Sequence, residues 1–352
     1  MLYPLFFCHI HKERIWGGRK LAEKYNRQLS HDKIGESWEI ACHENGMSII
    51  QNGAMKGMSL KEAIDKHGEE LLGSAVYNKD FQKFPLLIKI LDAEDDLSVQ
   101  VHPDDVYAGL YEDGELGKTE MWYIIDAKPG AKLVYGVREN CDKEGFRQRI
   151  EEGNLQICLQ ELEVKAGDVL YIPAGLVHAI GAGVLVCEIQ QNSDTTYRVY
   201  DWNRIDSNGH KRQLHIDKAL EVIDFHGNPK GSLPGLQLME SGGQRILYAA
   251  LKYFAMDELK IDGSMNLMMD GKRFQTLTCI EGKGNLYYKD GCETILAGNS
   301  CLLPASLSKA DLSGNGTFIR AWIPDRQNFI QCLDKAGYTK AQMSVVPGLP
   351  EF

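Results

Sequence analysis

The segment Gly167-Asp-Val-Leu-Tyr-Ile-Pro173-Ala-Gly175-Leu-Val-His178 decides the fold that this sequence predicts. The residues between Gly167 and Pro173 are mostly β-branched, aliphatic or aromatic, which is typical of a short strand. Pro173 and Gly175 then favour a turn, because proline cannot continue a strand ladder and glycine tolerates turn conformations. We therefore expect the strand to end at Pro173 and the redirected chain to aim His178 into the interior of a β-structure.

A second copy of this segment occurs nearer the C-terminus. It reads Gly298-Asn-Ser-Cys-Leu-Leu-Pro304-Ala-Ser306-Leu-Ser-Lys309, so the glycine, the five-residue strand and the Pro-Ala pair return in register. A hairpin pattern precedes each copy, over residues 121–135 and 277–288. Repeats of this kind predict two related domains. Because the second copy has Lys309 where the first has His178, we expect the second domain to bind no metal.

The spacing of glycine, proline and histidine in the first copy is similar to the second motif of cupin proteins. Short alternating runs bounded by turn residues dominate from Phe84 onward, and they predict a mainly β chain. We expect two cupin-type jelly-roll barrels with a few short helices, the helices lying at about 59–74, 141–152, 214–223 and 326–336.

The stretch 206–242 is rich in Gly, Ser and Pro and is the natural connection between the two barrels. We therefore predict a metal-bearing catalytic domain over residues 1–240, which includes a helical segment at about 59–80. A degenerate, metal-free domain is predicted over residues 241–352.

The composition restricts the classes of function. The chain has 352 residues, 43% of them apolar, and its 39 basic and 49 acidic residues give a net charge of −10. Such a charge disfavours broad surfaces for nucleic acids or anionic membranes. Histidines and charged residues interrupt the apolar start of the chain before it reaches the length of a signal or membrane segment. Nine scattered cysteines without a C-x-x-C pair predict no disulfide framework, and we expect a cytoplasmic protein.

Polar side chains alternate along the stretch from Leu97 to Pro103. Ser98, Gln100 and His102 share one face of this predicted strand, while valine and leucine occupy the other. Polar residues on the inner face of a barrel are unusual, because each buried polar group costs several kcal/mol, on the order of 2–7, unless a partner compensates it.

A divalent cation would compensate several such groups together. Glu120 begins the next strand and can reach the same cavity as His178. Two imidazoles, one carboxylate and one amide oxygen are a ligand set that suits zinc, with coordination left open for water or substrate. We therefore expect one Zn²⁺ per chain, bound by Gln100, His102, Glu120 and His178, although a barrel histidine can also be an ordinary core residue.

Six segments together resemble the type I mannose-6-phosphate isomerases in their short bacterial form. They are Trp16-Gly-Gly18, Gly35-Glu-Ser-Trp-Glu39, Phe84-Pro-Leu-Leu-Ile-Lys-Ile-Leu-Asp92, Ser98-Val-Gln-Val-His-Pro-Asp-Asp105, Gly117-Lys-Thr-Glu120 and Asp194-Thr-Thr-Tyr-Arg-Val-Tyr-Asp201. The resemblance implies the same four zinc ligands, and it implies that Arg198 is the active-site arginine. It also places Ser98, Lys118, Glu188, Asp194 and Arg204 at substrate-contacting positions. Arg204 stands where longer relatives have a lysine.

The implied reaction is the reversible isomerisation of mannose 6-phosphate and fructose 6-phosphate, feeding mannose and GDP-mannose metabolism. Exchange between an aldose and a ketose moves a proton through an enediolate, whose charge a zinc ion and Arg198 would stabilise. Candidates for the base are Glu188, Asp194, a zinc-bound hydroxide and Lys118. Ser98, Lys118 and Arg204 are the candidates for binding the phosphate.

Two other functions stay open at this point. Cupin barrels also host iron-dependent dioxygenases, although oxygen chemistry usually uses a ligand set richer in histidine. A sugar-phosphate sensor that has kept the pocket without turnover is the third hypothesis. The expected partner is a small sugar phosphate, without nucleic acid or membrane, and the chain is expected to be a monomer or a weak homodimer.

Overall fold

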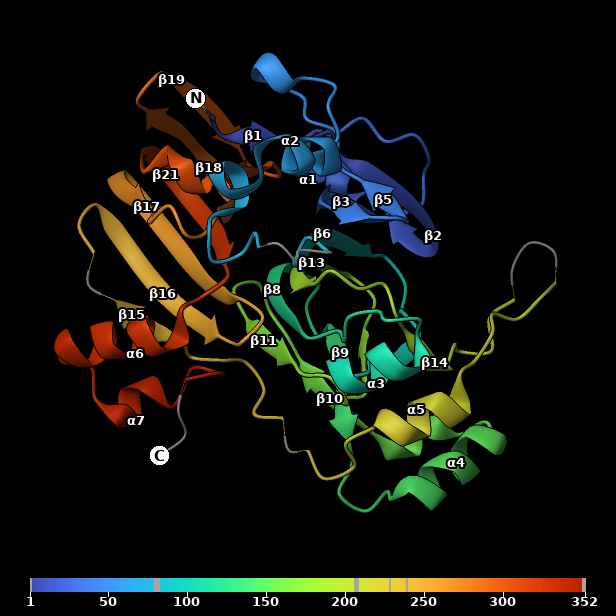
Figure 1. Ribbon diagram of the computed structural model, residues 1–352. Helices are drawn as coiled ribbons and strands as arrows, with labels where there is room; N and C mark the ends of the chain where they lie inside the picture. Colours follow the sequence, from blue (N-terminus) through green and yellow to red (C-terminus); the bar gives the residue numbers. More distant parts are fainter. Residues whose placement is uncertain (1, 79–82, 206–208, 228, 239, 350–352) are drawn as a thin grey trace. The chain divides into compact units, whose positions relative to one another are not determined.

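The structure is a computed structural model that describes residues 2–78, 83–205, 209–227, 229–238 and 240–349 (Figure 1). The chain divides into two compact units, each built from separate stretches of sequence. The central unit contains residues 11–37 and 90–232, and the terminal unit contains residues 1–10, 38–89 and 233–352. Residues 1–10 and 38–89 cluster with the C-terminal residues in this division, and the domains 1–240 and 241–352 stay predictions. The chain leaves the central unit for the terminal unit at residues 232–233, which lie within the predicted connection 206–242.

The central unit is built mainly from β-strands. Its strands are β2 (Ile10–Gly18), β7 (Val99–Val101), β8 (Glu120–Ala127), β9 (Lys132–Val137), β10 (Leu159–Glu163), β11 (Val169–Ile172), β12 (His178–Ile180), β13 (Val184–Gln191) and β14 (Tyr197–Tyr200). Two further strands, β3 (Ile34–Ile40) and β6 (Leu86–Ala93), belong partly to this unit and partly to the terminal unit. Its helices are α1 (Lys20–Tyr25), α3 (Asp105–Tyr111), α4 (Lys143–Glu151), α5 (Ile216–Val222) and the short 3₁₀ helix η2 (Leu155–Cys158).

Two sheets organise the central unit. One has five strands in the order β10-β9-β12-β7-β14, and the other has six in the order β11-β8-β13-β6-β2-β3. A single core cluster contains side chains from both sheets, among them Trp122, Leu133, Leu170 and Ile180. The two sheets therefore pack face to face around an apolar core, as in a β-sandwich.

The outer face of the five-stranded sheet is covered by helices. Val99 and Val101 of β7 share a core cluster with Phe146 of α4 and Leu220 of α5, and α4 and α5 lie beside each other in Figure 1. Because side chains alternate along a strand, Gln100 points away from this cluster and toward the other sheet.

The terminal unit holds the remaining elements. Its strands are β1 (Leu5–Phe6), β4 (Cys42–His43), β5 (Gly46–Met47), β15 (Leu236–Leu238), β16 (Gly243–Ala250), β17 (Ala255–Met268), β18 (Gln275–Tyr288), β19 (Gly291–Leu296), β20 (Ser300–Leu303) and β21 (Lys309–Trp322). Its helices are α2 (Leu60–Leu72), α6 (Arg326–Lys335), α7 (Lys340–Met343) and the 3₁₀ helices η1 (Gly53–Met55) and η3 (Ala305–Leu307). Most of its strands form one sheet in the order β1-β20-β18-β21-β17-β16-β15, and β19 pairs with β18.

The mainly β character and the four predicted helices are confirmed, the helices being α2, α4, α5 and α6. Helix α2 begins where a capping box predicts it, since Ser59 and Glu62 bind each other's backbone N–H groups. The end of the predicted segment 59–80 lies outside the described residues. Sequence patterning missed α1, α3 and α7, which have only four to seven residues each.

The predicted hairpins are wrong in detail. Residues 121–135 form β8 and β9, but these strands belong to different sheets, so the connection between them carries the chain from one sheet to the other. Residues 277–288 lie in one continuous strand, β18, whose register shifts between Cys279 and Glu281. Gly282 has a φ of 76° there. A glycine accommodates this irregularity inside a long strand, where the sequence pattern suggests a turn.

One disulfide contradicts the expectation drawn from the scattered cysteines. Cys141 and Cys158 are bonded, with their Cα atoms 5.6 Å apart. They lie just before α4 and at the end of η2, and both are buried in the cluster that covers the outer face of the five-stranded sheet. The two cysteines are 17 positions apart in the sequence and form no recognisable cysteine motif, because the pairing depends on how α4 folds back on the sheet.

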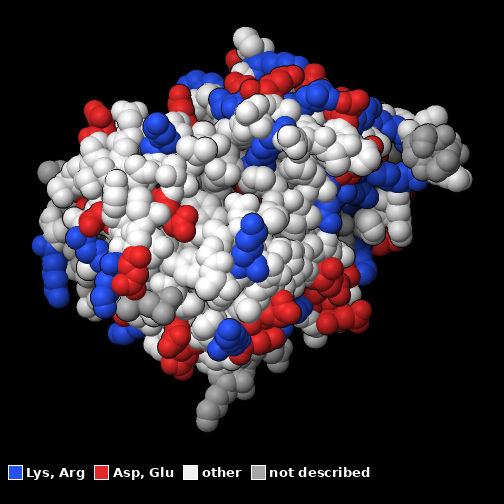
Figure 2. All heavy atoms as spheres, turned by 90° about the horizontal axis from the view of Figure 1, so that it is seen from above, with Lys and Arg blue, Asp and Glu red and all other residues white. Residues whose placement is uncertain are grey.

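The described surface carries charges of both signs. Acidic and basic side chains are interspersed over the face drawn in Figure 2, as expected for 39 basic and 49 acidic residues spread along the chain. Within the described residues, none of the helices combines the length and the apolar character needed to cross a bilayer.

Asp257 is the centre of a buried ion cluster in the terminal unit. Its carboxylate is fully buried and accepts hydrogen bonds from Arg320, through Nε at 3.0 Å and Nη2 at 2.6 Å, and from Nε of Arg245 at 2.6 Å. Burial raises the pKa of Asp257, but the two guanidinium groups outweigh it and hold the pKa below its usual value. The carboxylate is therefore charged and compensated.

We expect Asp257→Asn to lower the free energy of unfolding of this unit by about 3–5 kcal/mol, because the buried Arg320 and the partly buried Arg245 would lose their common counter-ion. Asp311→Asn is the matched control, since the Lys309–Asp311 pair is exposed and should contribute about 0–1 kcal/mol. Urea unfolding of both variants measures the difference. A loss in Asp257→Asn no larger than in the control would contradict a stabilising role for the buried cluster.

Candidate metal centre

Strand β7 sets one side of the candidate site. Gln100 pairs with His178 of β12 on one flank and with Arg198 of β14 on the other. Directly paired residues on neighbouring strands present their side chains on the same face of the sheet. His178, Gln100 and Arg198 therefore form a row across three strands, and His102, two residues after Gln100, follows on the same face.

The six-stranded sheet supplies the opposite side. Glu120 is the first residue of β8, and Trp122 follows on the same face. Glu188 of β13 is paired directly with Trp122. Glu120, Trp122 and Glu188 are all buried, so two carboxylates lie inside the sandwich at the end of the apolar core.

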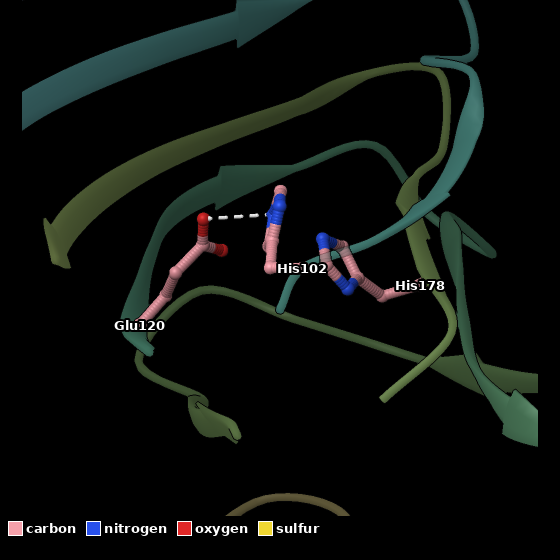
Figure 3. Close-up of side chains that lie close together, drawn as sticks. All are labelled: His102, Glu120 and His178. Atoms are coloured by element: carbon pink, nitrogen blue, oxygen red, sulfur yellow. Dashed lines mark ion pairs between the residues drawn. The ribbon is translucent and has the colours of Figure 1, made fainter. Parts of the chain in front are cut away.

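Figure 3 shows His102, Glu120 and His178 pointing toward one another. Their potential ligand atoms all lie within 4.8 Å of one another, and His102 Nε2 is 3.2 Å from Glu120 Oε1. The side-chain amide of Gln100 joins them, with its Nε2 3.3 Å from His178 Nε2. A half-turn of that amide exchanges its nitrogen and oxygen, so the same position can present Oε1 to a cation.

Backbone carbonyls fix the tautomers of both histidines. His102 Nδ1 lies 2.9 Å from the carbonyl oxygen of Thr195, and His178 Nδ1 lies 2.9 Å from that of Leu176. A carbonyl can only accept a hydrogen bond, so each Nδ1 carries the proton. Each Nε2 therefore presents a lone pair to the cavity, as metal-binding histidines do.

The electrostatics agree with this assignment. Burial lowers the pKa of His102 to about 3, with the charge of Lys118 acting in the same direction, and burial also lowers the pKa of His178. Burial raises the pKa of Glu120, but the nearby positive charge of Lys118 and the contact with His102 hold that pKa well below its usual value. The site thus combines two neutral imidazoles with an ionised carboxylate.

A cation is the missing partner in this arrangement. His102 Nε2 and Glu120 Oε1 are buried and make no hydrogen bond within the described residues, although Glu120 Oε1 is ion-paired with Lys118. With His102 neutral, their 3.2 Å contact sets a lone pair against a carboxylate oxygen, which is unfavourable unless a positive charge lies between them. Lys118 Nζ offsets part of this charge from 3.0 Å away. The nitrogen and oxygen donors fit a zinc ion.

Arg198 is oriented beside this cluster. Its Nε donates to Ser98 Oγ at 3.0 Å, and its Nη1 donates to the carbonyl of Gln213 at 3.1 Å. Burial lowers the pKa of this half-buried guanidinium, and the charge of Arg212 lowers it further. Ser98 and Arg198, both predicted site residues, are thus in direct contact, and Arg198 is paired directly with Gln100.

Arg204 belongs to a neighbouring group. Its Nε donates to Asp201 at 3.2 Å, and Arg212 donates to the same carboxylate through Nε at 2.6 Å. With Arg198 close by, three guanidinium groups surround one carboxylate. The described contacts of Arg204 hold it to Asp201, to the backbone of Asp96 and to the carboxylate of Asp95 at 3.9 Å, and none of these residues is a candidate metal ligand.

Asp194 lies in the loop between β13 and β14 and is partly exposed. The next residue, Thr195, supplies the carbonyl that fixes His102. Asp194 is therefore adjacent in sequence to a residue that contacts a candidate ligand. It lies in a loop, whereas Glu188 lies in strand β13.

Two side chains in this region were not expected from the motifs. Trp122 has a sequence signal, since it follows Glu120 at the two-residue period of a strand. Arg212 has none, because it lies outside any strand or helix and reaches Asp201 only through the fold.

Comparison with known proteins places these observations in a family. Residues 5–133 match the family model described as phosphomannose isomerase type I, catalytic domain, and residues 245–323 match the model of the mannose-6-phosphate isomerase cupin domain. The mannose-6-phosphate isomerase ManA of Bacillus subtilis is 42% identical over 311 residues, which are 88% of this chain and 96% of that protein.

Solved structures agree with the sequence comparison. A crystal structure of the mannose 6-phosphate isomerase from Bacillus subtilis has a TM-score of 0.84 and 37% identity, covering 91% of this chain and 99% of the other. A mannose 6-phosphate isomerase solved with zinc bound has a TM-score of 0.75 at 18% identity, covering 92% of this chain and all of the other. The second comparison supports the fold alone.

Proposed function

This chain belongs to the type I phosphomannose isomerase family, and from that premise we propose that it interconverts mannose 6-phosphate and fructose 6-phosphate. One observation in this structure supports the proposed chemistry independently of the family. Two imidazole lone pairs and one ionised carboxylate converge in the buried interior of the unit, and an arginine held by Ser98 lies in the neighbouring strand.

We propose that one Zn²⁺ is bound by Gln100, His102, Glu120 and His178. The ion would supply a positive charge that stabilises the enediolate oxygen atoms as the proton is moved. The protein contributes the orientation of the donors, since backbone carbonyls hold both imidazoles with Nε2 inward. Arg198 adds a second, permanent positive charge on the side of β14.

The proton itself needs a base close to the substrate carbon. Glu188 is the better supported candidate, because its buried carboxylate shares a hydrogen-bond donor with Glu120 and so lies next to the metal position. Lys118 is less well supported, because its ammonium group is ion-paired with Glu120, one of the proposed zinc ligands, at 3.0 Å. Asp194 stays an alternative from the loop beside Thr195.

The phosphate group would lie toward the arginines. Arg198, Arg204 and Arg212 carry three positive charges against the carboxylates of Asp201 and of Asp95, which lies 3.9 Å from Arg204, so the excess positive charge would attract a dianion. Ser98 can donate its hydroxyl hydrogen while it accepts from Arg198. Lys118 would act from the opposite side, near Glu120.

We further propose that the chain contains two related jelly-roll barrels and that the second lacks a metal site. In the first copy of the repeat Ile172 pairs with Glu120, whereas its counterpart in the second copy, Leu303, pairs with Gln275. His178 pairs with Gln100, whereas its counterpart Lys309 pairs with Met268. A ligand set of lysine, methionine and glutamine does not suit zinc. The two strand pairings make Glu120 equivalent to Gln275. The two hairpin patterns of the sequence, which start at residues 121 and 277, would instead make Glu120 equivalent to residue 276, so the two alignments differ by one residue.

The expected partner is a small sugar phosphate that enters mannose metabolism. We expect the protein in the cytoplasm as a monomer or a weak homodimer. In a reducing compartment Cys141 and Cys158 would be expected as thiols, so their redox state in freshly isolated protein tests that expectation.

A coupled assay with mannose 6-phosphate and fructose 6-phosphate tests the proposed function. We expect turnover in both directions and, because no step consumes oxygen, the same rate under anaerobic conditions. Turnover that requires oxygen would favour the iron-dependent dioxygenase instead. Binding of mannose 6-phosphate by metal-loaded protein without isomerisation would favour a sensor.

A further inference from the structure

Trp122 lies at the centre of the proposed site although it is not a metal ligand. It is 1% exposed, and its side chain lies on the same face of β8 as Glu120. Its ring meets His178 edge to face, with ring centroids 5.4 Å apart at an angle of 82°. Trp122 thus contacts two of the proposed ligands from within the apolar core.

The indole N–H joins the two buried carboxylates. Trp122 Nε1 lies 2.9 Å from Glu120 Oε2 and 3.0 Å from Glu188 Oε2. The indole nitrogen can only donate, and it has one hydrogen, so both acids share it. Two carboxyl groups this close repel each other when both are ionised, and a donor between them would offset part of that repulsion.

The shared donor also selects which oxygen of Glu120 faces the metal position. Because Oε2 is bound to Trp122, Oε1 is the atom that faces His102 Nε2 at 3.2 Å. The same N–H fixes Glu188 on the neighbouring strand, where the register pairs it with Trp122. One side chain thereby controls the direction of a ligand and the place of the candidate base.

We propose that Trp122 is a positioning residue that sets the geometry of both Glu120 and Glu188. This inference rests on the proposed function, since it assigns Glu120 to zinc binding and Glu188 to proton transfer. Partners that orient metal ligands typically change metal affinity or activity by about 10- to 100-fold when they are removed. Trp122 would act on the two processes through two separate hydrogen bonds.

Trp122→Phe tests the proposal, because it keeps an aromatic ring in the core and removes only the N–H donor and part of the ring. We expect the zinc dissociation constant, measured by competition with a chelator, to rise about 10- to 100-fold. At zinc saturation we expect kcat to stay reduced by about tenfold or more with KM little changed, because Glu188 would still be misplaced.

Trp16→Phe is the matched control. Trp16 is buried in the same core cluster, so this variant also trims a tryptophan, and its zinc affinity and kcat should equal those of the wild type. If Trp122→Phe does not fold, benzothienylalanine at position 122 keeps the ring size and replaces only the N–H by sulfur. Thermal unfolding of the zinc-free proteins checks that each variant is folded.

Zinc affinity within twofold of the wild type would overturn the role toward Glu120, and full recovery of kcat at zinc saturation would overturn the role toward Glu188. These outcomes are distinct from failure of the proposed function. If the wild-type chain has no zinc-dependent turnover, the function is wrong, whereas an active wild type with an unchanged Trp122→Phe variant overturns this inference alone.

Discussion

His178→Ala is expected to lose both bound zinc and turnover. His178 is fully buried, and its Nδ1 is held by the carbonyl of Leu176 with Nε2 toward Glu120 and Gln100. Alanine removes one of four proposed donors and leaves a space that water would fill. A metal that stabilises developing charge is worth several kcal/mol, so kcat/KM should fall by about 10³-fold or more, at about 1.36 kcal/mol per factor of ten.

The measurement is zinc content by elemental analysis together with the isomerase assay. His31→Ala is the matched control, because His31 is exposed, and both quantities should stay at the wild-type level. His102→Ala should behave as His178→Ala does. A His178→Ala protein that retains one zinc per chain would remove His178 from the ligand set and with it the assignment of this cavity.

Arg198→Ala should separate turnover from metal binding. The guanidinium lies next to Gln100 across the strand pair and is held by Ser98 and Gln213, but it offers no metal-binding atom. Zinc content should therefore stay at the wild-type level. Loss of a preorganised donor at developing negative charge typically lowers kcat by about 10²- to 10³-fold, and we expect an effect of that size here.

Arg198→Lys refines this prediction. Lysine keeps the charge but lacks the planar fork that reaches Ser98 and Gln213 together, so it should recover only part of the lost rate. Steady-state kinetics with mannose 6-phosphate at zinc saturation checks both variants. Wild-type kcat in Arg198→Ala would show that this arginine takes no part in the reaction, and loss of zinc would show that its role is structural.

Much of the fold follows from local patterns. The helices α2, α4 and α6 have side-chain N-caps, and α5 has none, yet all four lie within a few residues of the positions that the sequence predicts. The strand over 167–173 and the turn at Pro173 predict β11 and the approach of His178. These features depend on residues close together in the chain, which is why sequence patterning finds them.

Other features depend on contacts between distant segments. The clustering of residues 1–10 and 38–89 with the C-terminal residues has no local signal. The Cys141–Cys158 bond likewise requires that α4 fold back over the sheet. The continuous strand β18 absorbs Gly282 as an irregularity because β21 pairs along nearly all of its length.

In the candidate site, too, some features follow from local sequence patterns and others depend on contacts between distant segments. Alternation along 98–102 and the Pro-Gly turn before His178 indicate side chains that face inward, and the structure brings Gln100, His102, Glu120 and His178 together. The hydrogen bond from Trp122 to Glu188 joins residues 66 positions apart. Arg212 reaches Asp201 from another loop. No spacing rule within one strand reports such contacts.

Titration of metal-free protein with zinc, with isomerisation of mannose 6-phosphate followed at each addition, tests the central claim most directly. We predict no turnover without metal and a linear rise in rate that ends at one zinc per chain, because one cavity offers the four donors. Full turnover in the metal-free protein, or metal-loaded and folded protein that does not isomerise the substrate, would contradict it.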